Sequence, residues 1–179
     1  IDKAQSAGIH LSHLDTHMGT LLNSPALLQQ YFAVGRSYGL PILLEKTVDA
    51  SGHMKVGGDD IFYQTQLPAG EIVLDKVLQM FPGIPDSQWL DAYKKMLAPL
   101  PPGTYELIVH LAHDGPEMQG ATADHPDWGS KWRQNDFDMI QSAEFQQFLK
   151  DQHFVLIAWK DLDKLLPADY HSSPQTAAR

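Results

Sequence analysis

The stretch Thr104-Tyr105-Glu106-Leu107-Ile108-Val109-His110 decides the fold class, because it has the composition of a strand buried inside a sheet. A short apolar run bounded by turn residues is typical of such strands, and residues 101–103, Pro-Pro-Gly, interrupt the chain just before it. We expect further strands at residues 9–15, 40–45 and 154–159. Helix-forming segments separate them, and this alternation predicts a parallel α/β fold whose sheet is covered by helices.

The expected helices fill the segments between these strands. Ser24 followed by Pro25 has the pattern of an N-cap and a first helical residue. Gly39 is typical of a residue that ends a helix, so we expect a helix from Pro25 to Gly39. Residues 111–132 are expected to form a long loop. Further helices are expected at residues 1–8, 71–81, 86–97, 136–150 (in two pieces, with Ser142 as an internal cap) and 161–166.

The composition limits the class of protein. The chain has 179 residues, and we expect one domain at residues 1–166 followed by a frayed tail at 167–179. Thirteen basic against 22 acidic residues give a net charge of −9, the wrong sign for binding nucleic acid. No apolar run is long enough to span a membrane, and the absence of cysteine excludes disulfides and Cys-ligated zinc.

The segment His13-Leu14-Asp15-Thr16-His17 is a candidate metal site. Side chains alternate along an extended strand, so residues 13, 15 and 17 are expected on one face, at the carboxyl end of the strand. Imidazole and carboxylate groups are ligands of divalent metal ions, and a carboxylate can also orient a ligating histidine. The alternative is a polar strand end whose histidines only hydrogen-bond to loops.

His110 and the segment that follows it form a second candidate site. His110 ends the apolar strand, where it is either a reactive imidazole or a histidine satisfied in the core. The expected loop holds Trp128 and Trp132 and leads into Arg133. Indole rings near acidic and glycine residues suit the stacking and hydrogen bonding of sugar rings. The alternative is a surface flap whose tryptophans pack on the rest of the domain.

Several short motifs occur together in the chain. Residues 5–9 read Gln-Ser-Ala-Gly-Ile, and residues 12–18 read Ser-His-Leu-Asp-Thr-His-Met. With these segments the chain resembles the YdjC-like carbohydrate deacetylases, the chitooligosaccharide deacetylase family, which carries Thr/Ser-His-Leu-Asp-Ser/Thr-His after a helix that ends in glycine. Further matches are Tyr38-Gly39-Leu40-Pro41, residues 106–110, Arg133 with Asp136-Phe137, and residues 155–162.

The resemblance implies a metal-dependent carbohydrate N-deacetylase with a distorted (β/α) barrel, related to the polysaccharide deacetylases. This chain would supply the C-terminal part of the barrel, and four strands suit half of an eight-stranded one. The resemblance also implies that His17 binds a divalent metal ion (Mg or Zn) and that His110 is the general acid. We expect four further residues to support the metal or bind the substrate: His13, Asp15, Trp128 and Arg133.

The sequence departs from the family pattern at three places. The family's Asp-Asp pair and Gly-x-His segment, which supply the other metal ligands, do not precede His17, and Asp59-Asp60 lies downstream in the wrong order. Leu111-Ala112 replaces the Pro-Gly that follows the later histidine. The chain opens at Ile1 without a methionine, on what resembles the end of a helix. We therefore expect a processed or truncated chain, or upstream residues that hold the missing ligands.

The leading hypothesis is that the intact protein hydrolyses the N-acetyl group of an amino sugar or short oligosaccharide. Two alternatives stay open: a metal-dependent amide or ester hydrolase acting on other substrates, and a non-catalytic sugar-binding barrel remnant if the protein truly starts at Ile1. The expected partner is an N-acetylated sugar or oligosaccharide, with no nucleic acid and no membrane. Homodimer formation and the compartment, cytoplasmic or periplasmic and secreted, stay open.

Overall fold

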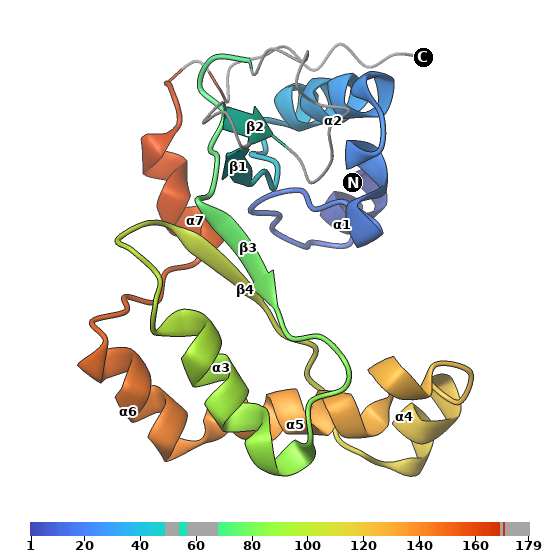
Figure 1. Cartoon of the computed structure of the whole chain (residues 1–179). Helices are drawn as coiled ribbons and strands as arrows, with labels where there is room; N and C mark the ends of the chain where they lie inside the picture. The colour runs from blue at the N-terminus through green and yellow to red at the C-terminus, as the bar shows by residue number, and fades with distance from the viewer. Residues whose placement is uncertain (49–53, 57–67, 169, 171–179) are drawn as a thin grey trace. The chain divides into compact units, whose positions relative to one another are not determined.

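The computed structural model describes residues 1–48, 54–56, 68–168 and 170. The chain forms two compact units: the first holds Ile1–Lys76 and Ile157–Arg179, and the second holds Val77–Leu156 (Figure 1). The pair Asp59-Asp60 lies outside the described residues. No helix in the described part of the chain is long and apolar enough to cross a membrane.

The first unit contains α2 (Pro25–Tyr38), which begins and ends where the sequence predicts. The side-chain oxygen of Ser24 accepts a hydrogen bond from the Leu27 N–H (3.2 Å), and the proline follows as the first helical residue. Gly39 ends the helix in the left-handed conformation, with φ of 62°. Glycine adopts this conformation without the steric penalty of a side chain, so both end signals are confirmed.

The core of the first unit lies between α2 and the extended segment that follows it. Its buried members are Leu28, Tyr31, Phe32, Ile42 and Leu44. The Tyr31 hydroxyl donates to the Leu14 carbonyl (2.6 Å) and accepts from the Leu43 N–H (3.2 Å), which ties three segments together. Gly35 allows this close packing, because a Cβ there would lie 2.6 Å from Cγ2 of Ile42.

The strands expected at residues 9–15 and 40–45 are reduced to isolated bridges. Leu14 pairs with Ile42, and Glu45 pairs with Leu74, both in the parallel direction. The parallel pairing and the surrounding helices confirm the α/β class. The remaining elements of the unit are α1 (Asp2–Ser6), η1 (His17–Leu22), the antiparallel pair β1 (Lys46–Val48) and β2 (Met54–Val56), α7 (Trp159–Leu162) and η5 (Asp163–Leu165).

One residue of the expected tail is tied to the first unit. Tyr170 is buried, and its hydroxyl hydrogen-bonds to the Leu40 carbonyl (3.3 Å) and to the Glu71 carboxylate (3.0 Å). Arg36 also forms an ion pair with that carboxylate (2.8 Å) and lies over the tyrosine ring. These contacts join the end of α2 to residues far away in sequence.

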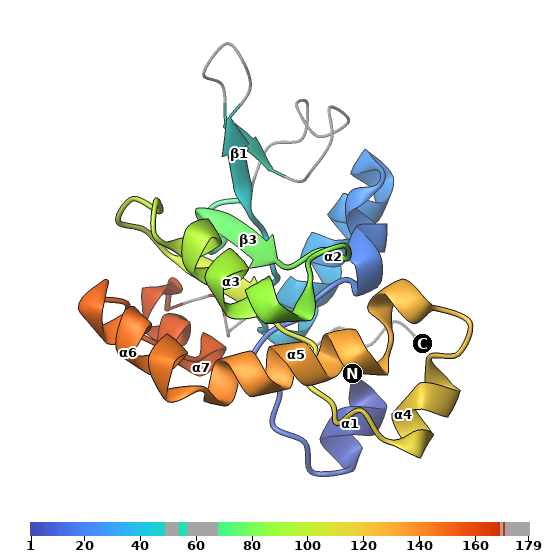
Figure 2. The same ribbon diagram turned by 60° about the horizontal axis from the view of Figure 1, so that its bottom comes forward.

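The second unit packs helices against a pair of strands. β3 (Lys76–Gln79) and β4 (Tyr105–Ile108) form a two-stranded sheet, so the strand expected at 104–110 is confirmed. Between them the chain forms η3 (Asp86–Gln88) and α3 (Trp89–Leu97), as expected. Figures 1 and 2 show α3 beside α5 (Ser130–Gln141) and α6 (Ala143–Asp151), and the three helices contact one another.

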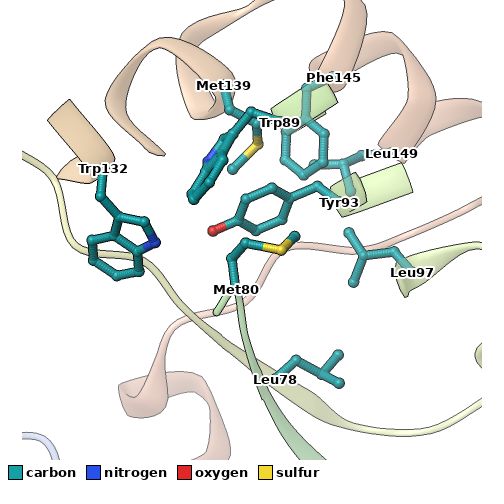
Figure 3. Packing of buried hydrophobic residues seen from close by; sticks show 9 residues of the cluster. All are labelled: Leu78, Met80, Trp89, Tyr93, Leu97, Trp132, Met139, Phe145 and Leu149. Carbon is teal, nitrogen blue, oxygen red and sulfur yellow. The ribbon is translucent and has the colours of Figure 1, made fainter. Parts of the chain in front are cut away.

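Ser142 separates α5 from α6, as the sequence predicts. Its side-chain oxygen accepts a hydrogen bond from the Phe145 N–H (3.1 Å). The helices enclose an aromatic core in which Tyr93 lies centrally, with its hydroxyl directed to the side of Trp89 and Trp132 (Figure 3). The cluster consists of Leu78, Met80, Trp89, Tyr93, Leu97, Trp132, Met139, Phe145 and Leu149.

The prediction of a helix at residues 71–81 is wrong. This segment is extended, and it pairs through Leu74, whose N–H donates to the Leu44 carbonyl and whose carbonyl accepts from the Lys46 N–H, each at 2.8 Å. It then continues into β3. The β-branched residues Ile72 and Val73 suit an extended backbone, and pairing with a segment remote in sequence decided the outcome.

Two other expectations are also wrong. Residues 111–132 are not a structureless loop, because they form α4 (Pro116–Ala121) and η4 (Pro126–Trp128), each with proline in its first turn, and then enter α5. Residues 154–159 do not form a strand, because no segment in the described part of the chain pairs with them. An apolar run becomes a strand only where a neighbouring strand offers a ladder for its backbone groups; here the Phe154 N–H bonds instead to the Leu149 carbonyl (2.8 Å).

Candidate active site

His110 lies just beyond the end of β4, in the second unit. Its backbone N–H donates a hydrogen bond to Oδ2 of Asp136 (3.0 Å), and its ring lies 4.8 Å from the Trp132 ring at an angle of 49°. Both partners come from α5. The strand and the helix thus place a half-buried imidazole at one fixed position.

Asp136 is the most enclosed ionisable group beside this histidine, with 0% of its surface exposed. Its Oδ1 accepts hydrogen bonds from the indole N–H of Trp89 (2.9 Å) and from the hydroxyl of Tyr93 (2.6 Å). Burial, followed by the hydrogen bond to this carboxylate, raises the pKa of Tyr93 well above its usual value. The tyrosine therefore stays protonated and remains a donor.

The electrostatic surroundings disfavour the charged form of His110. Burial lowers its pKa, the positive charge of Arg133 lowers it further, and the carboxylate of Asp136 partly opposes both. Its Nδ1 is buried and has no hydrogen-bond partner among the described residues, and the same is true of Nε1 of Trp132 and Nε of Arg133. Leaving a buried polar atom unpaired costs about 1–3 kcal/mol, and such atoms are explained by a bound water or ion or by a functional role.

An aromatic path leads from this histidine to the surface of the unit. The Trp132 ring lies 4.9 Å from Trp128, which in turn lies 6.3 Å from Phe81. Phe81 is 60% exposed, and the Arg133 guanidinium lies 6.0 Å from the Trp132 ring. The structure therefore brings together His110 and the two predicted substrate residues Trp128 and Arg133.

Asp114 holds the segment after the histidine against α5. Its carboxylate accepts hydrogen bonds from Gln119 (2.8 Å) and Ser130 (2.7 Å), and its backbone N–H donates to Gln134 (2.9 Å). The hydrogen bonds from Gln119 and Ser130 lower the pKa of this carboxyl group. The segment that follows β4 is thus ordered by side chains of α4 and α5, with Leu111-Ala112 in the place of the family's Pro-Gly.

The residues of the other predicted site belong to the first unit and are arranged differently. His13 stacks on Trp159, with ring centroids 4.4 Å apart and an angle of 7°. Burial lowers the pKa of His13, which Asp15 partly opposes. The Asp15 side chain accepts from the neighbouring Thr16 N–H (2.6 Å), and His17 is exposed at the start of η1. The chain is still extended at Thr16 and turns into η1 at His17.

This arrangement does not fit a complete metal site. Within the part of the chain that the structure describes, no three His, Asp or Glu side chains gather where they could hold an ion. His17 presents one imidazole, and four donors are typical even of a small zinc site. The residues present do not by themselves form the metal centre that the family resemblance implies.

Sequence reasoning missed the contribution of Asp136 to the His110 site. The residue was noted only as part of a motif that opens a helix. Trp132, Asp136 and Met139 are spaced i, i+4 and i+7 and are all buried on one face of α5. A carboxylate within an apolar stripe of helical period is the signal that could have identified it.

Comparisons with known proteins agree with this architecture. Residues 1–151 match the family described as YdjC-like protein. A carbohydrate deacetylase from Thermus thermophilus is 29% identical over 145 residues, which cover 79% of this chain and 50% of that protein. The chain thus spans about half the length of this relative.

A solved structure gives a likeness of fold. A protein from Enterococcus faecalis described as a cellobiose-phosphate cleavage protein superposes with a TM-score of 0.58 and 18% identity, over 90% of this chain and 57% of that one. At this identity the likeness concerns the fold alone. The family match, in contrast, extends over residues 1–151 of 179. The chain belongs to the YdjC-like family.

Proposed function

We propose that the protein containing this chain removes the N-acetyl group from an amino sugar or short oligosaccharide. Family membership and the carbohydrate deacetylase from Thermus thermophilus support this class of reaction. The observation that carries the proposal is the His110 cluster, where an imidazole whose Nδ1 has no partner among the described residues lies beside the indole of Trp132. We further infer that the whole protein is a distorted (β/α) barrel, of which this chain forms the C-terminal part.

His110 is the proposed proton donor to the leaving amine. Breaking the amide releases an amine, which needs a proton at the moment the C–N bond breaks. Because burial and Arg133 both disfavour the imidazolium, a proton on this ring is given up more readily than one on a free histidine. Because Nδ1 is buried, we assign the proton transfer to Nε2 of His110.

Trp128 and Arg133 are the proposed substrate residues. Trp128 and the exposed Phe81 offer aromatic surface for the apolar face of a sugar ring. The Arg133 guanidinium supplies hydrogen-bond donors for the hydroxyl or carbonyl oxygens of the sugar, and its buried Nε has no partner within the described part of the chain. The aromatic surface and the donor lie in the same unit as the proposed acid.

His17 is the proposed ligand of a divalent ion, Mg²⁺ or Zn²⁺, with His13 and Asp15 as supporting residues. The other ligands would have to come from outside the described residues, because these residues do not form a complete site. Dialysis against a chelator, followed by titration with Mg²⁺ or Zn²⁺, tests this assignment through bound metal as well as activity.

The direct test of the proposed function is acetate release from N-acetylated chito-oligosaccharides, with Mg²⁺ or Zn²⁺ added. We expect acetate from the wild-type protein and none from a chelated sample. Failure to release acetate from any such sugar, with metal demonstrably bound, contradicts the proposal. Sugar binding without acetate release would favour a non-catalytic sugar-binding protein, and activity restricted to simple acetyl esters would favour a different hydrolase.

A further inference from the structure

The buried carboxylate of Asp136 takes no part in the steps described above, although it contacts the main chain of the proposed acid. We infer that Asp136 is a positioning residue, which holds the backbone of His110 beyond the end of β4 and so sets the place of its imidazole. This inference rests on the proposed function for its catalytic meaning. Its geometry is independent of any activity.

The two oxygens of the Asp136 carboxylate accept hydrogen bonds from different elements. Oδ1 accepts from Trp89 and Tyr93, both on α3, and Oδ2 accepts from the His110 N–H. The donors are an indole, a phenol and a peptide group, and none of them carries a compensating positive charge. A buried carboxylate is costly unless hydrogen bonds satisfy it, and hydrogen bonds to an ionised acceptor are stronger than neutral ones.

The position of His110 in the chain explains why its backbone needs a side-chain acceptor. β4 ends at Ile108, so the histidine lies two residues past the last residue of the ladder. In the residues that the structure describes, no hydrogen-bond partner of the imidazole Nδ1 orients the ring. Two contacts place the ring: the hydrogen bond from the His110 backbone N–H to Asp136, and the packing of the imidazole against Trp132. The charged groups that face it, Arg133 and Asp136, both come from α5.

The test compares Asp136→Asn with Tyr93→Phe in the full chain. Asp136→Asn has nearly the same shape but removes the charge and the strong acceptor for His110. Tyr93→Phe is the matched control, because it removes a donor to the same carboxylate and leaves Oδ2 and the charge in place. His110→Gln assigns the NMR signals of the histidine, and the melting temperature of each variant reports on folding.

Two NMR measurements decide the outcome. Amide hydrogen exchange at His110 should speed up by about 10- to 100-fold in Asp136→Asn, relative to other amides of the second unit, which corresponds to the loss of a hydrogen bond to a charged group. The pKa of the His110 imidazole should fall, because the carboxylate that favours its charged form is gone. Tyr93→Phe should leave the exchange rate of the His110 amide and the pKa of its imidazole close to the wild-type values.

The inference is overturned if folded Asp136→Asn keeps the wild-type exchange and titration of His110. It is also overturned if Tyr93→Phe changes both as strongly, because the effect would then be general loosening of the core. Should Asp136→Asn fail to fold, the wild-type chain decides: the His110 amide must exchange at least about tenfold more slowly than an unstructured peptide, and an unprotected amide refutes the inference. Because no readout requires turnover, a failure of the proposed deacetylase activity is distinguishable from a failure of this inference.

Discussion

The two histidine sites of this chain contain similar residue types but receive different support from the fold. His110 is tied through its backbone to a carboxylate with 0% exposure, which lies in the aromatic core of the second unit. His17, in the first unit, is exposed at the start of a short helical segment, where its side chain has solvent around it. A functional histidine held by packing can keep one geometry, whereas an exposed one depends on whatever ligand it meets.

In this chain, regular spacing in the sequence does not coincide with support from the fold. The His-x-Asp-x-His segment has the more regular spacing, but His13 stacks on Trp159, and Asp15 bonds to the adjacent backbone. His110 stood alone in the sequence, yet it is the histidine around which Trp132 and Asp136 assemble. Four experiments test this contrast.

The largest expected effect is that of His110→Ala on turnover. Losing a general acid should cut turnover about 10²–10⁴-fold, while the bound metal stays at the wild-type level. His113→Ala is the matched control, because His113 is an exposed histidine of the same segment. Acetate release and metal content should be measured on folded protein. Loss of metal from His110→Ala, with metal retained in His17→Ala, would reverse the two assigned roles.

The second effect concerns His17→Ala. If this imidazole is a ligand, metal affinity should fall by about tenfold or more. The free energy of unfolding without metal should change by less than about 0.5 kcal/mol, as is usual for exposed positions. Isothermal titration with Zn²⁺ and urea unfolding provide the two numbers, with the exposed His10→Ala as control. An unchanged metal affinity would remove His17 from the site.

The third experiment compares the two units through matched helix caps. Ser24 caps α2 in the first unit, and Ser142 caps α6 in the second. Each substitution to alanine should lower the free energy of unfolding by about 0.5–2 kcal/mol, because one backbone N–H loses its acceptor. Thermal unfolding measures this, with the exposed Ser87→Ala as control. If Ser24→Ala and Ser142→Ala shift different transitions, the units unfold separately; a single shared shift shows that they unfold together.

The smallest expected effect is a loss of stability on acidification. Burial lowers the pKa of both His13 and His110 from the ordinary value of 6.5. The unfolded chain therefore binds more protons than the folded one, and this contribution to stability is present above pH 6.5 and lost as the pH falls through the folded-state pKa. The effect is small because both side chains are partly exposed.

Urea unfolding at about pH 7.5 and about pH 5.5 measures this pH dependence. His110→Gln and His13→Gln should each reduce the difference in stability between the two pH values. If stability rises on acidification and neither variant alters the pH dependence, the two histidines are not buried in the manner described.

Much of the fold was readable from local signals. The caps at Ser24 and Ser142 and the glycine after α2 depend on neighbouring residues, so the local sequence is sufficient to predict them. The expected helix at residues 71–81 failed for the opposite reason. Leu74 bonds to Leu44 and Lys46, which lie about thirty residues away in the chain, and such a pairing leaves no local trace.

The residue types that are available for chemistry are already evident in the amino-acid sequence. The sequence identified His110, Trp128 and Arg133 as candidates, because the hydrogen-bonding capacity of imidazole, indole and guanidinium groups does not depend on their position in the chain. Its short motifs also indicated the family. Which of these candidates lie next to one another depends on the packing of elements that are distant in the sequence. This packing joined Asp136 on α5 to Trp89 and Tyr93 on α3 and to the histidine after β4. It also left the regularly spaced His13, Asp15 and His17 without a shared centre among the described residues. The physical reason is that a buried charge needs donors from several elements at once, and only the packing of those elements brings the donors together.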